Sequence, residues 1–266
     1  MVREFADKNE WAVILGASSG LGLATAKKLA AHGLNLCLLY RARRSEQPSI
    51  EATFNEMEKA HSIRLIHFNA DVVKVETRTK ATERMKEISN DGGKIKALVH
   101  SIAKGNLKPM VSESKKELGN DDFHLTLENM AISLYDWTKS LFDAKLFSED
   151  ARIVSFTSEG NTRAWRNYGA ISTAKVALEA ITRSIALEFA SYGIRANCIQ
   201  AGMTDTSSFR RIPGHEMLRQ NVLKRNPFHR MTTPNDVANV VYLLLKEEAR
   251  WINGAIIPVD GGEHLS

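Results

Sequence analysis

Short apolar runs alternate with longer amphipathic stretches along almost the whole chain, and this pattern limits the possible folds more than any other feature. The short runs predict seven strands: Ala12–Leu15, Leu34–Tyr40, Ile63–Phe68, Ala97–His100, Arg152–Phe156, Arg195–Ile199 and Ala255–Val259. The stretches between them have helical periodicity. We therefore expect an α/β fold, a doubly wound parallel sheet of about seven strands with helices on both faces and right-handed crossovers. Ligands of such a sheet bind at the carboxyl ends of its strands.

Composition adds limits rather than a function. A chain of 266 residues with 43% apolar content is expected to form a single domain over residues 1–266. No apolar run is long enough to span a bilayer and residues 1–11 are charged, so we expect a cytoplasmic protein with no membrane association. Cys37 and Cys198 lie in apolar runs and are expected to be buried thiols. No zinc spacing and no nucleic-acid recognition module is present, so we predict neither partner.

A glycine-rich turn follows the first predicted strand. The sequence Gly16-Ala17-Ser18-Ser19-Gly20-Leu21-Gly22 comes directly after Leu15, and a helical pattern begins at Leu23. Glycines allow a sharp turn and close approach of the backbone, and the free N–H groups at a helix start favour a pyrophosphate. Because this strand, turn and helix open an alternating chain, they predict a Rossmann-type dinucleotide site that includes Gly16, Ser18, Ser19, Leu21 and Gly22.

The end of the second strand indicates which dinucleotide is preferred. Proteins that prefer NADH usually place an acidic residue there, whereas this chain has Tyr40-Arg41-Ala42-Arg43-Arg44. Guanidinium groups pair with phosphate in bidentate geometry. We therefore predict that Tyr40, Arg41 and Arg43 contact the cofactor and that NADPH is favoured over NADH; a solvated loop is the alternative.

Tyr168 and Lys175 stand seven positions apart in a helical pattern. A positive charge near a phenol favours its phenolate form, and the pair is expected to act as proton donor and electrostatic anchor.

The order of these motifs resembles that of the short-chain dehydrogenase/reductase superfamily over essentially the full length. Further matching segments are Asn69-Ala70-Asp71-Val72, Asn197 and Val259-Asp260-Gly261-Gly262. Within the superfamily the chain resembles divergent enoyl-[acyl-carrier-protein] reductases, because six residues rather than three separate Tyr168 from Lys175. Three other segments agree: Val99-His100-Ser101-Ile102-Ala103, Ala201-Gly202 and Asp205-Thr206. Residues 178–183 and Ile212-Pro213 look similar to the NADPH-using type-III enzymes.

The resemblance implies roles for further residues. Asp71 and Val72 would hold the adenine. Ser101, Ile102, Ala103, Gly202, Thr204 and Thr206 would lie along the rest of the cofactor. Lys175 would bind the nicotinamide ribose, and Ser158 aligns with the active-site serine of the superfamily, where many enoyl reductases have a second tyrosine. The helix asparagine of the superfamily is absent, with Ala131 or Ser133 near its place.

The wider spacing suits enoyl reduction. Seven helical residues rise about 10.5 Å and four rise about 6 Å, yet both spacings return to a similar face. In an enoyl thioester, hydride goes to C3 while charge develops on the thioester oxygen at C1, so a displaced phenol can reach that oxygen and stabilise the enolate. Two alternatives stay open: a carbonyl or 3-oxoacyl reductase, favoured by Ser158, and a nucleotide-binding protein without turnover, favoured by the missing asparagine.

Residues 207–230, which include Pro213 and Gly214, form the least regular stretch and predict a lid over a pocket. Its apolar residues are suited to line an acyl slot: Phe209, Ile212, Met217, Leu218, Leu223 and Phe228. Its basic residues are suited to attract an acidic acyl carrier protein: Arg210, Arg211, Arg219, Lys224, Arg225 and Arg230. A solvated basic surface is the alternative. The resemblance also implies a homotetramer that uses helices around residues 125–146 and 174–192.

Overall fold

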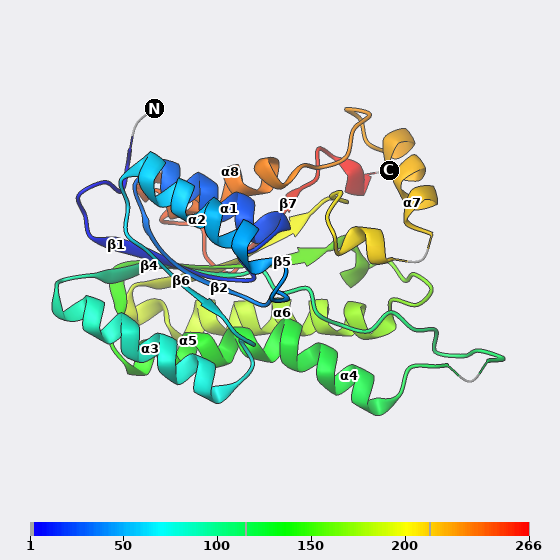
Figure 1. Ribbon diagram of the computed structural model, residues 1–266. Helices are drawn as coiled ribbons and strands as arrows, with labels where there is room; N and C mark the ends of the chain where they lie inside the picture. The colour runs from blue at the N-terminus through cyan, green and yellow to red at the C-terminus, as the bar shows by residue number, and fades with distance from the viewer. Residues whose placement is uncertain (1–2, 115, 213, 266) are drawn as a thin grey trace.

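A parallel sheet forms the centre of the computed structural model, which describes residues 3–114, 116–212 and 214–265 (Figure 1). Pro213 of the predicted lid lies outside the described residues. The strands are β1 (Glu10–Leu15), β2 (Asn35–Tyr40), β3 (Leu65–Asn69), β4 (Lys94–His100), β5 (Phe147–Ser158), β6 (Ile194–Ala201) and β7 (Ile256–Val259). They form one seven-stranded sheet in the order β3-β2-β1-β4-β5-β6-β7, with every neighbouring pair parallel. The predicted Rossmann-type α/β fold is confirmed.

Helices cover both faces of this sheet (Figure 1). One layer holds α1 (Gly20–Ala31), α2 (Gln47–His61) and α8 (Pro234–Leu245). The other holds α3 (Val75–Asn90), α5 (Ser133–Asp143) and α6 (Gly169–Glu188), with α4 (Asn120–Leu127) packed on α6. Alternate residues of one strand serve the two layers, since Ala12 and Ile14 pack in the first core and Val13 and Leu15 in the second. Burial on both faces explains why the strands read as continuous apolar runs.

The sheet reverses its winding direction between β1 and β4. The chain runs outward from β1 to β2 and β3, and then returns to place β4 on the other side of β1. The crossovers on the two sides of this point lead to opposite faces, which leaves a crevice at the carboxyl ends of the strands, where a doubly wound sheet binds its ligand. The segment with α7 (His215–Arg225) stands beside this same edge (Figure 1).

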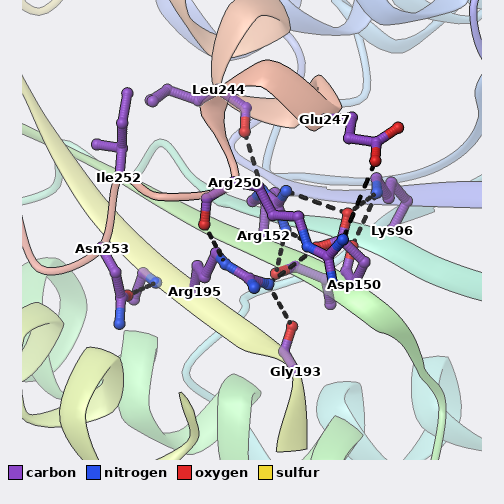
Figure 2. A network of polar contacts seen from close by, with 12 residues as sticks. Lys96, Asp150, Arg152, Gly193, Arg195, Leu244, Glu247, Arg250, Ile252 and Asn253 are labelled. Carbon is purple, nitrogen blue, oxygen red and sulfur yellow. Dashed lines mark hydrogen bonds and ion pairs between the residues drawn. The ribbon is translucent and has the colours of Figure 1, made fainter.

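Toward the amino ends of β4, β5 and β6, one carboxylate lies among several cations and joins these strands (Figure 2). Asp150 accepts hydrogen bonds from Lys96 at 2.8 Å, from Arg152 and from Arg195 at 2.8 Å. Arg152, 1% exposed, also donates its Nε to the carbonyl of Leu244 in the last turn of α8. Burial opposes ionisation of Asp150, but the hydrogen bonds from Arg152 and Lys96 outweigh it and lower its pKa to about 2. This network joins β4, β5 and β6 to the end of α8.

The structure also gives the state of the two cysteines and the character of the helices. Cys37 and Cys198 are both free and buried, as predicted, and burial raises their pKa values to about 12 and about 11. Within residues 3–114, 116–212 and 214–265, no helix is long and apolar enough to cross a membrane.

We predict that Asp150→Asn lowers the free energy of unfolding at pH 7 by about 3–5 kcal/mol, because it leaves buried cations without their carboxylate. Asp143→Asn is the matched control: Asp143 pairs with Lys139 on the surface, and its loss is expected to cost under about 1 kcal/mol. Urea denaturation of both variants measures the difference. Since the pKa of Asp150 is lowered from 3.8, its contribution is complete above pH 3.8 and is lost as the pH falls toward 2. Equal losses in the two variants would contradict this assignment.

Candidate active site

A cavity of about 480 Å³ opens at the carboxyl ends of the strands. It is lined by most of the residues that the sequence singles out: Gly16, Ser18, Ser19, Leu21, Tyr40, Arg41, Asp71, Val72, Ser101, Ile102, Ala103, Ser158, Tyr168, Lys175, Gly202, Thr204 and Thr206. Gly22 and Arg43 are the two predicted site residues that do not line it. Residues far apart in the sequence thus meet in one crevice at the switch point of the sheet.

The glycine turn brings two backbone segments into close contact. A Cβ atom on Gly16, which has φ +87°, would lie 2.2 Å from the carbonyl oxygen of Ser101. A Cβ on Gly22 would lie 2.2 Å from the carbonyl oxygen of Gly16. Gly22 is buried under the turn and lets the start of α1 pack closely against it, and its place in the cofactor site stays a prediction. The first N–H groups of α1 then lie at the cavity, suited to an anion.

Two cations converge on one carboxylate at the end of β2. Asp71 Oδ2 lies 3.2 Å from the guanidinium of Arg41 and 3.3 Å from Nζ of Lys104. Lys104 follows Ala103 in the loop after β4, and sequence reasoning missed it because the ion pair spans 33 residues. Arg43 does not line the cavity, and its backbone N–H donates a hydrogen bond to Glu46. Arg41 and Lys104 are therefore the cations that line this end of the cavity.

Tyr40 lies at the same strand end, but its ring packs into the core. The ring is 1% exposed, with Phe54 and His67 against it at centroid distances of 5.5 and 6.0 Å. Its hydroxyl has no hydrogen-bond partner among the described residues. The ring therefore packs in the core while the residue also lines the cavity, and its contact with a cofactor stays a prediction.

Lys175 is buried on α6 with its ammonium aimed at the sheet. Its Nζ donates a 2.6 Å hydrogen bond to the carbonyl of Phe156 on β5. Burial lowers the pKa of Lys175 to about 8, and the Glu179 carboxylate one helical turn later opposes this shift. The ammonium form still dominates at pH 7, so the cavity keeps one fixed positive charge at its floor.

Tyr168 immediately precedes the first residue of α6 and lies beside the cavity floor. Sequence reasoning expects Lys175 to lower the pKa of the phenol, but the structure gives the opposite direction. Burial raises the pKa of Tyr168, and the nearby hydroxyl of Ser158 opposes the rise only in part. Lys175 does not offset this rise in pKa, because its ammonium is directed to the carbonyl of Phe156 and Lys175 stands two helical turns along α6 from Tyr168. The phenol is therefore protonated at neutral pH and available as a donor.

Ser158 Oγ is a buried oxygen without a geometrically satisfactory hydrogen-bond partner in the described residues, although it lies near the phenol. An unpartnered buried hydroxyl is costly. The pair of hydroxyls at residues 158 and 168 is thus poised to share a third polar atom.

A buried histidine and serine lie near the position of the missing helix asparagine. His100 Nε2 and Ser133 Oγ are 2.8 Å apart, and burial, with Lys175 adding to it, lowers the pKa of His100 to about 3. Ala131 lies in η1 (Glu128–Ile132), a π-helical turn between α4 and α5. His100 is therefore neutral and hydrogen-bonded, rather than only packed.

The segment 207–230 contributes less to the cavity than its sequence suggests. Phe209 and Ile212 line the cavity, but the other predicted apolar lining residues do not: Met217, Leu218, Leu223 and Phe228. Helix α7 is polar around most of its circumference and buries only Val222. Much of the apolar lining comes from other elements, and it includes Leu107, Met130, Phe156, Trp165, Ile171 and Met203.

Several of the predicted rim cations are engaged within the chain. Arg210 forms two hydrogen bonds to Asp205, and Arg230 forms two to Asp236. Arg225 pairs with Glu159 and Glu263. Arg211 and Lys224 have no ion-pair partner in the part of the chain that the structure describes.

Metal ligation finds no support in the geometry. Among residues 3–114, 116–212 and 214–265, no group of three or more His, Cys, Asp or Glu side chains is arranged to hold a metal ion.

The chain matches known proteins over nearly its whole length. Residues 16–264 match the family model described as enoyl-(acyl carrier protein) reductase. The chain is 30% identical to 1-cyclohexenylcarbonyl-CoA reductase of Streptomyces collinus, over 98% of this chain and 89% of the relative.

 The chain is 27% identical to 7alpha-hydroxysteroid dehydrogenase of Paraclostridium sordellii, over 97% of this chain and 93% of that relative. The match to the NADH-dependent enoyl reductase of Aquifex aeolicus, also 27% identical, covers 96% of this chain and 91% of that relative.

A solved structure agrees with these matches. The crystal structure of the Bacillus cereus enoyl-acyl carrier protein reductase with NADP+ and an indole naphthyridinone has a TM-score of 0.84 and 25% identity, over 100% of this chain and 99% of that one. The sheet, the glycine turn and the crevice define the class: an oxidoreductase of the short-chain dehydrogenase/reductase superfamily. Within that superfamily, the chain belongs to the enoyl-(acyl carrier protein) reductase family.

We predict that Gly16→Ala destabilises the protein by about 1–3 kcal/mol more than Gly214→Ala. Both glycines have positive φ, at +87° and +79°, so the cost of a left-handed alanine is shared. Among the described residues other than its chain neighbours, a Cβ on Gly214 meets nothing within 4 Å, whereas one on Gly16 meets the Ser101 carbonyl. Urea denaturation of the two variants gives the difference. Equal costs would mean that the backbone approach at Gly16 is not as close as described.

Proposed function

We propose that this protein uses NADPH to reduce the C2=C3 double bond of an enoyl thioester, as an enoyl-[acyl-carrier-protein] reductase of fatty-acid biosynthesis. The observation that carries the proposal is the placement of Tyr168 at the start of α6, with Lys175 two turns later on a similar helix face. Both residues line the cavity, and the phenol is protonated at neutral pH. Such a phenol can donate to a thioester oxygen as negative charge develops on it.

The cofactor is proposed to lie along the residues that line the cavity. The glycine turn and the start of α1 suit its pyrophosphate, Asp71 and Val72 its adenine, and Lys175 its nicotinamide ribose. When bound, NADPH supplies the hydride. Arg41 and Lys104 at the adenosine end favour a 2′-phosphate, which NADPH has and NADH lacks. The relative in Aquifex aeolicus is named for NADH, so the preference rests on these two cations.

Within the site, each side chain has a proposed task. Tyr168 donates the hydrogen bond, and then the proton, to the oxygen side of the substrate. Lys175 holds the ribose and keeps a positive charge below it. The hydroxyl of Ser158 lies near the phenol and has no well-placed hydrogen-bond partner among the described residues, and it helps to hold the same substrate oxygen.

Reduction of a carbonyl or 3-oxoacyl thioester is the second candidate, and Ser158 favours it because carbonyl reducers of the superfamily use a serine there. The 27% identical steroid dehydrogenase is a relative of that kind by name. Assays with crotonyl and acetoacetyl thioesters, run side by side with NADPH, separate the two. Faster oxidation of NADPH with the acetoacetyl thioester would favour the second candidate, and cofactor binding without turnover of either would favour a nucleotide-binding protein.

The acyl group is proposed to reach the site on acyl carrier protein, under a lid formed by residues 207–230. Phe209 and Ile212 line the cavity, which supports a place for the acyl chain. Arg211 and Lys224 are the rim cations without an internal ion pair among the described residues, so they are the best candidates to attract an acidic carrier.

A homotetramer is proposed from exposed apolar side chains on the two helical regions that the resemblance implies. These side chains are Leu125, Ile132, Tyr135, Val176, Leu187 and Tyr192, which are 39–81% exposed. Apolar side chains gathered on helices in this way are typical of an interface.

We predict that Tyr168→Phe lowers kcat with crotonyl thioester by about 10²–10³, because one donor to the developing oxyanion is lost. NADPH binding, followed by the fluorescence of the bound cofactor, should be unchanged. Tyr135→Phe, on the exposed face of α5, is the matched control and should retain activity. Near-normal turnover of Tyr168→Phe would remove Tyr168 from the mechanism.

We predict that Arg41→Gln raises the KM for NADPH by about tenfold or more, because a charge-assisted hydrogen bond to phosphate is lost. The KM for NADH should change little. Arg43→Gln, next to it but outside the cavity lining, should leave both values nearly unchanged. A larger effect at Arg43 than at Arg41, or equal effects on the two cofactors, would contradict the structural assignment.

A further inference from the structure

The short turn after β5 forms one wall around the ring of Tyr168. This turn is η2 (Glu159–Asn161), and Gly160 is buried in it. A Cβ on Gly160 would lie 2.5 Å from Cε1 and 3.0 Å from Cδ1 of Tyr168. Trp165 lies on the ring as well, edge to face, with centroids 5.2 Å apart. Any shift of the turn toward the phenol must therefore move the phenol.

A buried side chain of helix α6 holds this turn by hydrogen bonds. The buried carboxylate of Glu179 accepts hydrogen bonds from Thr157 and Asn161, both at 2.5 Å. Glu179 lies one helical turn after Lys175, so the helix that carries the proposed ribose anchor is also bonded to β5 just before the turn and to the last residue of the turn.

Arg225 of helix α7 holds the turn by an ion pair with Glu159. At the end of α7, its guanidinium donates to both oxygens of Glu159, at 3.2 and 2.5 Å, and to Glu263 Oε1 at 2.7 Å. Glu263 in turn accepts from the backbone N–H of Met203 at 3.2 Å. The side chains of Arg225, Glu159 and Glu263 are 19%, 12% and 3% exposed, so solvent screens these contacts less than it screens surface pairs.

One side chain thus joins three parts of the site. Arg225 links the segment 207–230, the turn that packs on Tyr168, and the backbone beside Gly202 and Thr204. Its partners lie 66 and 38 residues away in the sequence. Burial lowers the pKa of Arg225, but the two carboxylates outweigh it and raise the pKa, in accord with a charge held in place by both.

We propose that Arg225 is a positioning residue, which acts through Glu159 and Gly160 to hold the Tyr168 phenol where it donates to substrate. The proposal rests on the proposed function of Tyr168 as the donor. It differs from a role in carrier attraction, because the charge of Arg225 is engaged inside the chain. It also predicts an effect on kcat rather than on cofactor binding.

The test compares Arg225→Gln and Glu159→Gln, singly and together, with Arg84→Gln on the surface of α3 as the matched control. Both single variants should lower kcat with crotonyl thioester by about tenfold to a hundredfold while the Kd for NADPH stays the same. Arg225 also pairs with Glu263, and Glu159 also pairs with Arg163, so each single variant loses one further ion pair. The double variant should lose less than the sum of the two single losses, because the contact that they share is removed in both. Arg84→Gln should match the unmodified protein. Unchanged kcat in Arg225→Gln, or additive losses in the double variant, would overturn the proposal.

A second variant and a second readout separate positioning from a loss of folding. Gly160→Ala pushes on the phenol without touching an ion pair, and should also lower kcat with unchanged NADPH binding. The fluorescence of Trp165, obtained as the difference from the matching Trp165→Phe protein, should change in Arg225→Gln and Gly160→Ala but not in Arg84→Gln. A Trp165 signal that is the same in all of them would overturn the proposal.

The fluorescence readout needs no substrate. If the unmodified protein reduces no thioester, the proposed function fails, and the Trp165 signal still decides whether Arg225 sets the surroundings of the phenol. If turnover is present and the Trp165 signal is unaffected by Arg225→Gln, the function stands and the positioning role is wrong.

Discussion

The packing of α6 across the carboxyl end of β5 is the constraint on which the site depends. Lys175 reaches the Phe156 carbonyl, and Glu179 reaches Thr157 and Asn161, so two polar side chains on the same helix are bonded to one strand end. Tyr168 immediately precedes the helix, so these contacts also determine where Tyr168 lies. Buried polar groups that are bonded in this way specify a single arrangement, because any other leaves them unpaired.

Contacts at the amino ends of the strands keep the sheet rigid beneath the site. Asp150 and its cations tie β4, β5 and β6 to the end of α8, while the glycine turn ties β1 and α1 to the loop after β4. The loops between these two regions contribute the side chains of the cavity. A rigid sheet with functional loops at one edge is the arrangement by which doubly wound proteins hold a ligand.

Local pattern was enough to predict the strands and the glycine turn, because each depends on neighbouring residues. The apolar runs gave every strand to within a few residues, except that β5 begins earlier, at Phe147. Most predicted site residues line one cavity, since they follow strands whose carboxyl ends meet. Long-range contacts were beyond such reasoning. Arg225 with Glu159, and Lys104 with Asp71, join residues far apart in sequence, and nothing local marks them.

Burial also altered the expected chemistry. Tyr40 was assigned to the cofactor from its place at the end of β2, and its ring packs in the core while the residue also lines the cavity. The pKa of Tyr168 was expected to fall, but it rises because desolvation outweighs any charge within reach. The phenol is protonated at neutral pH, so the proposed role of Tyr168 as a donor does not need a lowered pKa.

The most direct test of the account is a crystal structure of the protein with NADP+ and an enoyl thioester. We expect the Tyr168 hydroxyl within hydrogen-bond distance, about 2.6–3.2 Å, of the thioester carbonyl oxygen, with C3 of the acyl group facing the nicotinamide. A hydroxyl turned away from the nucleotide crevice, or a crevice closed to the cofactor, would contradict it.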